Sequence, residues 1–145
     1  MTKVLFVCHG NICRSPMAEF IFKALAQARG AEVYAESAAV STEEVGNPIY
    51  PPAKRSLRQH GIPFDEAKRA RQVRPDDYDR FDRILCMDTS NLRLLRRIIP
   101  ADPAGKVHLM MAATGSGRDV ADPWYTDDFE RTFQDLLAAC EAMLT

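Results

Sequence analysis

The sequence predicts an α/β fold in which a doubly wound, four-stranded parallel sheet carries helices on both of its faces. Four short apolar runs alternate along the chain with segments that have helical periodicity. The runs are apolar at nearly every position, as in strands that are covered on both sides. The 145 residues, 46% of them hydrophobic, are enough for a single domain over 1–145 with a sizeable core.

The first third of the chain is typical of a strand, a tight loop, a helix and a second strand. Residues 4–7 form an apolar run within an expected strand over 3–7, and residues 8–15 are mostly small or polar. Residues 16–29 have apolar side chains at helical spacing, with a proline at the first position and a glycine just past the end. A second strand is expected over 32–40.

Shorter elements are expected in the middle of the chain. They are a loop over 41–52, a helix over 53–60, a helical turn over 75–81, a third strand over 83–87 and a helix from about 88 to 98. Asp88 or Ser90 is the expected N-cap of that last helix.

The last third of the chain predicts a fourth strand over 106–110, a turn over 114–117 and an amphipathic helix over 126–144. Right-handed crossovers between parallel strands place the loops that follow the strands along one edge of the sheet. The result is a flavodoxin-like, three-layer arrangement in which ligands bind at that edge. Because the loops after the first and fourth strands meet there, we expect Cys8 and Asp122 to share a site.

The loop over 8–15 has the features of an anion-binding site. A strand that leads through a tight loop into a helix directs backbone N–H groups and the positive end of the helix at one point. Gly10 and Asn11 are residue types that tolerate positive φ. Arg14 can fold back and bind two phosphate oxygens at once, and Ser15 is expected to cap the helix and to donate a hydrogen bond toward the sulfur of Cys8.

An anion-binding loop of this kind would also favour the thiolate of Cys8 over the thiol. Taken alone, Cys8 could be only a small buried residue at the end of a strand. The arginine six residues later, the Gly-Asn pair between them and the Ser-Pro pair after them favour a nucleophile instead.

The stretch 7–19, Val-Cys-His-Gly-Asn-Ile-Cys-Arg-Ser-Pro-Met-Ala-Glu, resembles the N-terminal signature of the low molecular weight protein tyrosine phosphatases. The resemblance implies that Cys8 is the nucleophile and that Arg14 binds the phosphate. It also implies that Ser37 supports the loop through a hydrogen bond to Asn11; the alternative is that Ser37 is only an ordinary serine at the end of a strand. The implied substrate-binding residues are His9, Gly10, Asn11, Ile12, Cys13, Ser15, Trp124 and Tyr125.

The stretch Asp-Pro-Trp-Tyr over 122–125 resembles the second signature of that family. It implies that Asp122 is the general acid and base, although a residue in the first turn of a helix is the alternative. Trp124 and Tyr125 would line a slot for an aromatic ring. The implied reaction is the hydrolysis of phosphotyrosine through a cysteinyl-phosphate, with no metal or other cofactor.

The chain departs from the family pattern at several positions. Lys68 stands where members have a histidine behind the phosphate loop, so the contact of that histidine is either missing or replaced. Trp124 stands where the family has the first of two tyrosines, and Thr126 where it has a glycine. Glu43 and Glu44 lie in a loop that forms one wall of the family's crevice. There they would disfavour acidic substrates or favour a basic residue beside the phosphate, or else they are solvated loop charges.

Two loop residues bear on substrate and regulation. Ile12 resembles the apolar residue of tyrosine phosphatases rather than the threonine of the related protein-arginine phosphatases, which favours phosphotyrosine. Cys13 resembles the second cysteine of members in which a disulfide to the nucleophile prevents irreversible oxidation; packing within the loop is the alternative.

Three other functions share parts of this pattern. A protein-arginine phosphatase or an arsenate reductase would have the same fold, and a phosphoprotein-binding module could keep the anion-binding loop without catalysis. Arsenate reductases need a relay of further cysteines, for which Cys86 and Cys140 are poorly placed, and they lack the Asp-Pro-aromatic-aromatic slot.

The composition narrows the choice of partners and of compartment. A net charge of −1 suggests neither nucleic acid nor an anionic membrane as a partner, and no apolar run is long enough to insert into a membrane. The N-terminus lacks an export signal and the four cysteines lack zinc spacing, so a reducing cytoplasm is expected. The expected partner is a phosphotyrosine-containing protein, with a cognate tyrosine kinase as one candidate, and the expected state is a monomer.

Overall fold

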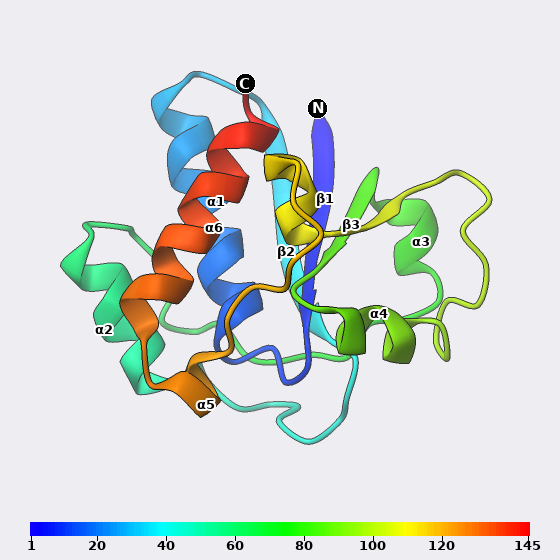
Figure 1. Ribbon diagram of the computed structural model, residues 1–145, viewed down its shortest axis with the longest axis horizontal. Coiled ribbons are helices and arrows are strands. Elements are labelled where there is room, and N and C mark those ends of the chain that lie inside the picture. Colours follow the sequence, from blue (N-terminus) through cyan, green and yellow to red (C-terminus); the bar gives the residue numbers. More distant parts are fainter.

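The computed structural model describes all residues from 1 to 145, which are built around one four-stranded sheet (Figure 1). The strands are β1 (Thr2–Cys8), β2 (Val33–Ala39), β3 (Arg83–Cys86) and β4 (Val107–Leu109). All neighbouring strands are parallel, in the order β2-β1-β3-β4. This order is that of a flavodoxin-like, doubly wound sheet, so the predicted fold class is confirmed.

Helices cover both faces of this sheet and produce three layers (Figure 1). One face carries α1 (Arg14–Ala28), α2 (Pro51–Gln59), α5 (Pro123–Thr126) and α6 (Phe129–Met143), and the other carries α3 (Asp77–Arg80) and α4 (Thr89–Leu95). Within the first layer α1 packs against both β2 and α6. No helix of the structure has the combination of length and apolar character that crossing a membrane requires.

Strand β1 belongs to the cores on both sides of the sheet. Side chains alternate between the two faces of a strand. Val4, Phe6 and Cys8 therefore join the larger core cluster beneath α1 and α6, whereas Leu5 and Val7 join the cluster on the other side. All five side chains are at most 4% exposed, which explains why the run is apolar throughout.

The prediction of a single helix over 126–144 is wrong. The chain forms the short α5, then a break, then α6. Asp127 at the break has a left-handed backbone with φ of 57°, a conformation that aspartate tolerates better than most residues. Asp128 then caps α6 by accepting a hydrogen bond of 3.0 Å from the backbone N–H of Arg131. Asp127 and Asp128 thus form the junction between two helices.

The other boundaries agree with the expectation to within a few residues, but the 3-10 helix η1 (Met110–Thr114) was not expected. Helix α1 begins at Arg14, two residues ahead of the expected start. Ser15 consequently lies inside α1 and is not its N-cap. For α4 the N-cap is Asp88, whose side chain and that of Asn91 each accept a hydrogen bond from the other's backbone N–H.

Asp77 holds the segment before β3 in place. Its carboxylate is fully buried and accepts hydrogen bonds from the guanidinium groups of Arg71 at 2.9 Å and Arg80 at 3.0 Å, and from the backbone N–H of Arg74 at 2.8 Å. Burial by itself would raise the pKa of Asp77, but the hydrogen bonds from Arg71 and from Arg74 outweigh burial, so the pKa is lowered.

Replacing Asp77 with Asn should lower the free energy of unfolding at neutral pH by roughly 1.5–3 kcal/mol, the usual contribution of hydrogen bonds to a charged group. Because the folded-state pKa is lowered, the stabilisation is present above the unfolded pKa of about 4 and is lost as the pH falls through the folded value. Urea denaturation at neutral and acidic pH measures both effects. The matched variant Asp76→Asn, at a side chain that is 67% exposed, should change stability by less than about 0.5 kcal/mol.

Candidate active site

The loop between β1 and α1 lies at the carboxyl edge of the sheet, beside the point where the strand order reverses. Cys8 ends β1 and is 4% exposed. Its Sγ accepts a hydrogen bond of 3.3 Å from the backbone N–H of Asn11 and lies 3.0 Å from the Oγ of Ser15. The loop therefore directs polar hydrogens at the sulfur, as the sequence predicts.

The two loop residues expected to tolerate positive φ differ in their roles. Asn11 has φ of 61°, in the left-handed region, and is 1% exposed. Gly10 is not in that region; a Cβ added to it would lie 3.1 Å from the Cγ of Glu44. At Gly10 the constraint is thus the close approach of the Glu44 side chain and not the backbone conformation.

Every hydrogen-bonding position of the Asn11 amide is used. Its Nδ2 donates to Ser15 Oγ at 2.8 Å and to Ser37 Oγ at 2.9 Å. Its Oδ1 accepts from the backbone N–H of Arg71 at 3.1 Å and from Lys68 Nζ at 3.3 Å. The expected bond between Ser37 and Asn11 is present, and the saturated amide holds the strained loop residue in place.

This network also orients the hydroxyl group nearest the sulfur. Ser37 donates its own proton to Glu19 at 2.7 Å, so it is an acceptor for Asn11. Ser15 likewise accepts from Asn11, which leaves its proton free to point at Cys8. Ser15 therefore contacts the sulfur as expected, although it does so from within α1.

Lys68, at the position where the resemblance implies a histidine, lies behind the loop and donates to Asn11 Oδ1. Besides Asn11 Oδ1, its Nζ donates to the carbonyl oxygen of Ser37 at 3.3 Å and lies 3.9 Å from Glu19 Oε1. Burial lowers the pKa of Lys68 from its ordinary value, while Glu19 opposes that effect. A lysine ammonium is only a donor, so it keeps Asn11 Oδ1 turned toward itself and Nδ2 turned toward the two serines.

Replacing Lys68 with Met should lower kcat by about tenfold, because Asn11 loses one of its two acceptor contacts at a cost of about 1.4 kcal/mol. KM should change less, since Lys68 lies behind the loop and does not line the cavity. Lys68→His should recover part of kcat by restoring a donor. Steady-state kinetics on an aryl phosphate measures these values, with the exposed neighbour variant Arg69→Gln as a control expected to match the wild type. A Lys68→Met enzyme with unchanged kcat would contradict this assignment.

Arg14 is the buried cation of the site, with a side chain only 4% exposed. Its guanidinium donates to the carbonyl oxygen of Val120 at 3.0 Å and pairs with Asp88 at 2.9 Å and with Asp122 at 3.4 Å. Burial by itself lowers the pKa of Arg14, but the acidic groups around it outweigh burial, so its pKa is raised. The guanidinium is thus charged and positioned by two carboxylates and one carbonyl group.

Asp122 is brought to this edge by the segment that leaves η1. The backbone N–H of Val120 donates to the carbonyl oxygen of Met87 at 2.8 Å, which extends the edge beyond β3. Asp122 then caps α5: its Oδ1 accepts from the backbone N–H of Trp124 at 3.0 Å, while Oδ2 faces Arg14. With a side chain 30% exposed, the carboxylate is open to the cavity.

A cavity of about 530 Å³ lies where these groups converge. The expected site residues that line it are Cys8, His9, Gly10, Ile12, Cys13, Arg14, Asp122, Trp124 and Tyr125. Asn11, Ser15 and Ser37 do not line it, because they are buried behind the loop. Trp124 and Tyr125 are 62% and 85% exposed, and the Trp124 ring lies 5.3 Å from that of Tyr50.

The cavity is also lined by Glu43 and Glu44, from the loop that the resemblance places at one wall of the crevice. Asp88, Ser90 and Asn91 line it as well, and the sequence analysis did not assign these three to the site. Asp88 was expected only to cap a helix, and it also pairs with Arg14. Its position just after a strand, at the same edge as Cys8, was a signal that could have identified it.

The second cysteine of the loop has a free thiol, as do the other three cysteines of the chain. Burial raises the pKa of Cys13, and the charges of Cys8 and Asp122 act in the same direction. The disulfide between Cys8 and Cys13 stays a prediction.

Comparison with known proteins gives a consistent result over nearly the whole chain. The sequence model of a family described as low molecular weight phosphotyrosine protein phosphatase matches residues 3–145. A Bacillus subtilis relative, the low molecular weight protein-tyrosine-phosphatase YfkJ, is 40% identical over 99% of this chain and 94% of its own length. The human low molecular weight phosphotyrosine protein phosphatase is 38% identical over 97% of this chain and 92% of its own.

Solved structures agree with these sequence relatives. The crystal structure of Bacillus subtilis YfkJ superposes with a TM-score of 0.93 over 99% of this chain and 92% of that one. The Drosophila arginine phosphatase superposes with a TM-score of 0.89 at 32% identity, over 99% of this chain and 96% of that one.

Proposed function

The chain belongs to the low molecular weight phosphotyrosine protein phosphatase family, and we propose that it hydrolyses phosphotyrosine with Cys8 as nucleophile, Arg14 as phosphate-binding residue and Asp122 as general acid and base. The observation that carries the assignment is the convergence of these three side chains on one cavity from distant parts of the chain. The relatives are named as enzymes, so this chain is an enzyme of the same class.

In the first step the Cys8 sulfur attacks phosphorus and forms an S–P bond while the bond to the phenolic oxygen breaks. The backbone N–H groups of the loop and the Arg14 guanidinium stabilise the equatorial oxygens, on which negative charge is spread. Support for this role comes from the guanidinium's fixed geometry: Val120, Asp88 and Asp122 hold it at the cavity floor before substrate arrives.

Asp122 gives its proton to the departing phenolate oxygen. In the second step a water molecule attacks the cysteinyl-phosphate, Asp122 takes a proton from that water, and inorganic phosphate and the Cys8 thiolate are released. The carboxylate's partial exposure and its contact with the phosphate-binding arginine support both roles. The proton donated by Ser15 toward the sulfur stabilises the thiolate as leaving group.

Phosphotyrosine is favoured over phosphoarginine by two features of the cavity. Ile12, the apolar residue at the position that distinguishes the two classes, lines the wall, and Trp124 and Tyr125 offer aromatic surface beside Asp122. The fold alone does not separate the two substrates, since an arginine phosphatase superposes nearly as well as the tyrosine phosphatases.

An arsenate reductase is disfavoured by the position of the remaining cysteines. Cys86 and Cys140 belong to different core clusters, on opposite faces of the sheet. Burial raises the pKa of Cys86 to about 12 and also raises the pKa of Cys140. Two buried thiols separated by a sheet do not form a relay to Cys8.

The partners that we propose are phosphotyrosine proteins, among them a cognate tyrosine kinase, and the proposed active form is a monomer in the cytoplasm. Four free thiols are typical of a reducing compartment.

Initial rates on a phosphotyrosine peptide, a matched phosphoarginine peptide and arsenate, measured side by side, test the proposal. The expected result is turnover of phosphotyrosine well above that of phosphoarginine, with no arsenate reduction. Faster release of phosphate from phosphoarginine would overturn the substrate assignment, and absence of turnover on all three would overturn the enzymatic one.

A further inference from the structure

The mouth of the cavity has a wall that carries unbalanced negative charge. Glu43 and Glu44, in the 41–47 loop, both line the cavity. The side chain of Glu43 is 69% exposed, and Glu44 accepts a hydrogen bond of 2.6 Å from the uncharged amide of Asn47. No lysine or arginine lies within ion-pair distance of either carboxylate; the only partner is His9, 3.1 Å from Glu43 and charged only when protonated.

A second wall, at α4, has positive charge just outside the cavity lining. Ser90 lines the cavity, whereas Arg93 and Arg97 do not. The two arginines follow Ser90 at spacings of three and seven residues, Arg97 in the turn after α4, which places all three on one face of the helical segment. Arg93 donates to Ser90 Oγ at 3.4 Å. Both arginines are exposed, and neither forms an ion pair with a carboxylate.

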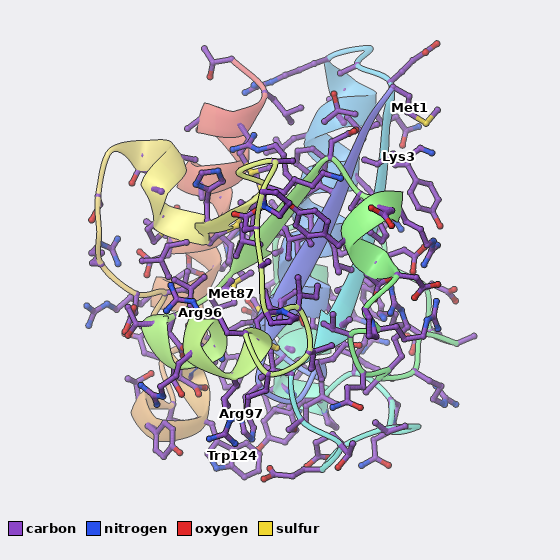
Figure 2. All side chains as sticks on the ribbon, turned by 90° about the vertical axis from the view of Figure 1, so that its right-hand side faces the viewer. Met1, Lys3, Met87, Arg96, Arg97 and Trp124 are labelled. Carbon is purple, nitrogen blue, oxygen red and sulfur yellow. The ribbon has the colours of Figure 1, made fainter.

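Figure 2 shows the two sides of this segment. Arg97 lies below α4, toward the end of the molecule where Trp124 lies, whereas Arg96 lies on the opposite side of the helix. The acidic groups near the start of α4 are already engaged: Asp88 pairs with Arg14, and Asp119 accepts the backbone N–H of Thr89. The arginine charge at the mouth is therefore available to a bound partner.

We propose that the two walls select a phosphotyrosine segment that carries an acidic side chain on the α4 side and a basic side chain on the side of the 41–47 loop. The inference rests on the proposed function and adds the class of protein substrate. At the cavity floor Arg14 is already paired with Asp88 and Asp122, so it is not free to pair with a flanking carboxylate. An extended peptide advances about 3.3 Å per residue, so residues two or three positions from phosphotyrosine extend roughly 7–10 Å toward the walls.

The size of the effect follows from the exposure of these charges. An exposed ion pair typically changes an affinity by about 1.4-fold to fivefold, and salt weakens it. Two matched flanks should therefore change kcat/KM severalfold relative to flanks of a single sign.

The test uses phosphotyrosine peptides of one length with four flank patterns: acidic then basic, basic then acidic, acidic on both sides, and basic on both sides. In the wild type one of the two mixed patterns should have a kcat/KM severalfold above both single-sign patterns, and high salt should reduce the difference. The double variant Arg93→Gln/Arg97→Gln should lose the preference for the acidic flank and keep that for the basic flank. The double variant Glu43→Gln/Glu44→Gln should do the reverse.

Arg96→Gln is the matched control, because it removes the same charge from the opposite side of the segment, and it should keep the wild-type preference. A small aryl phosphate, which does not reach the walls, should be hydrolysed by Arg93→Gln/Arg97→Gln at the wild-type rate. Equal rates on all four peptides, the best rate on a single-sign peptide, or an equal effect of Arg96→Gln would overturn the inference. Failure of the wild-type enzyme to hydrolyse the aryl phosphate would instead overturn the proposed function.

Discussion

Replacing Cys8 with Ser should lower kcat for phosphotyrosine by about 10⁴-fold or more, since loss of a nucleophile can cost other enzymes about 10⁶-fold. The nucleophile is a thiolate, and the surrounding hydrogen-bond donors favour an anion at this position. A serine hydroxyl is not ionised near neutral pH, so it does not replace the thiolate. The substitution changes one buried atom of similar size, so the loop should keep its shape. Rates of phosphate release from a phosphotyrosine peptide give the result.

Binding of inorganic phosphate, measured by calorimetry, shows whether the loop of the Cys8→Ser protein remains intact, and it should stay within a few fold of the wild type. Cys140→Ala is the matched control: this thiol lies on α6, is fully buried next to Ala18 of α1, and does not line the cavity. It should retain wild-type kcat. Turnover by Cys8→Ser at a rate near that of the wild type would exclude the cysteinyl-phosphate mechanism.

Asp122→Asn should lower kcat for phosphotyrosine by about 10²–10⁴-fold, the usual contribution of general acid catalysis. The loss should be smaller for a nitro-substituted aryl phosphate, because its phenolate departs without a proton. Asparagine is as good an N-cap as aspartate, so the bond to the backbone N–H of Trp124 should be kept and α5 should still form. Comparison of the two substrates therefore separates acid catalysis from a structural defect.

Asp128→Asn is the matched control for Asp122→Asn. Asp128 caps α6 as Asp122 caps α5, but it does not line the cavity. Its replacement should leave both substrates unaffected. An Asp122→Asn enzyme that lost equal activity on good and poor leaving groups would argue that the carboxylate positions Arg14 rather than transferring a proton.

The sequence predicted the fold because its strongest signals are local. The apolar run of β1 and the helical periodicity of α1 come from burial on a repeating geometry, which a pattern of residues records directly. The break at Asp127 was missed because it depends on a left-handed backbone at one residue, while the apolar stripe that begins at Phe129 continues the same helical spacing. Similarly, η1 follows β4 without any proline or glycine to mark its start.

The residues expected at the cavity were predicted from their sequence motifs and from their positions just after strands, at the carboxyl edge of the sheet. Lys68 could not be interpreted from the sequence, since a lysine on a basic stretch is usually solvated and its contacts with Asn11, Ser37 and Glu19 come from distant segments. The position of Ser15 inside α1 also depends on tertiary context: no side chain caps that helix, and its first residue is the buried Arg14.

The alternation of β1 between the two cores has a consequence for how this chain can diverge. Inserting or deleting a single residue within Thr2–Cys8 would exchange the two sets of side chains, sending those beneath α1 and α6 to the opposite layer. The sulfur would turn away from the arginine in the same event that moved the phenylalanine of the strand into the opposite core. Insertions and deletions in this segment should therefore be selected against for two reasons, because they would impair folding and because they would abolish turnover.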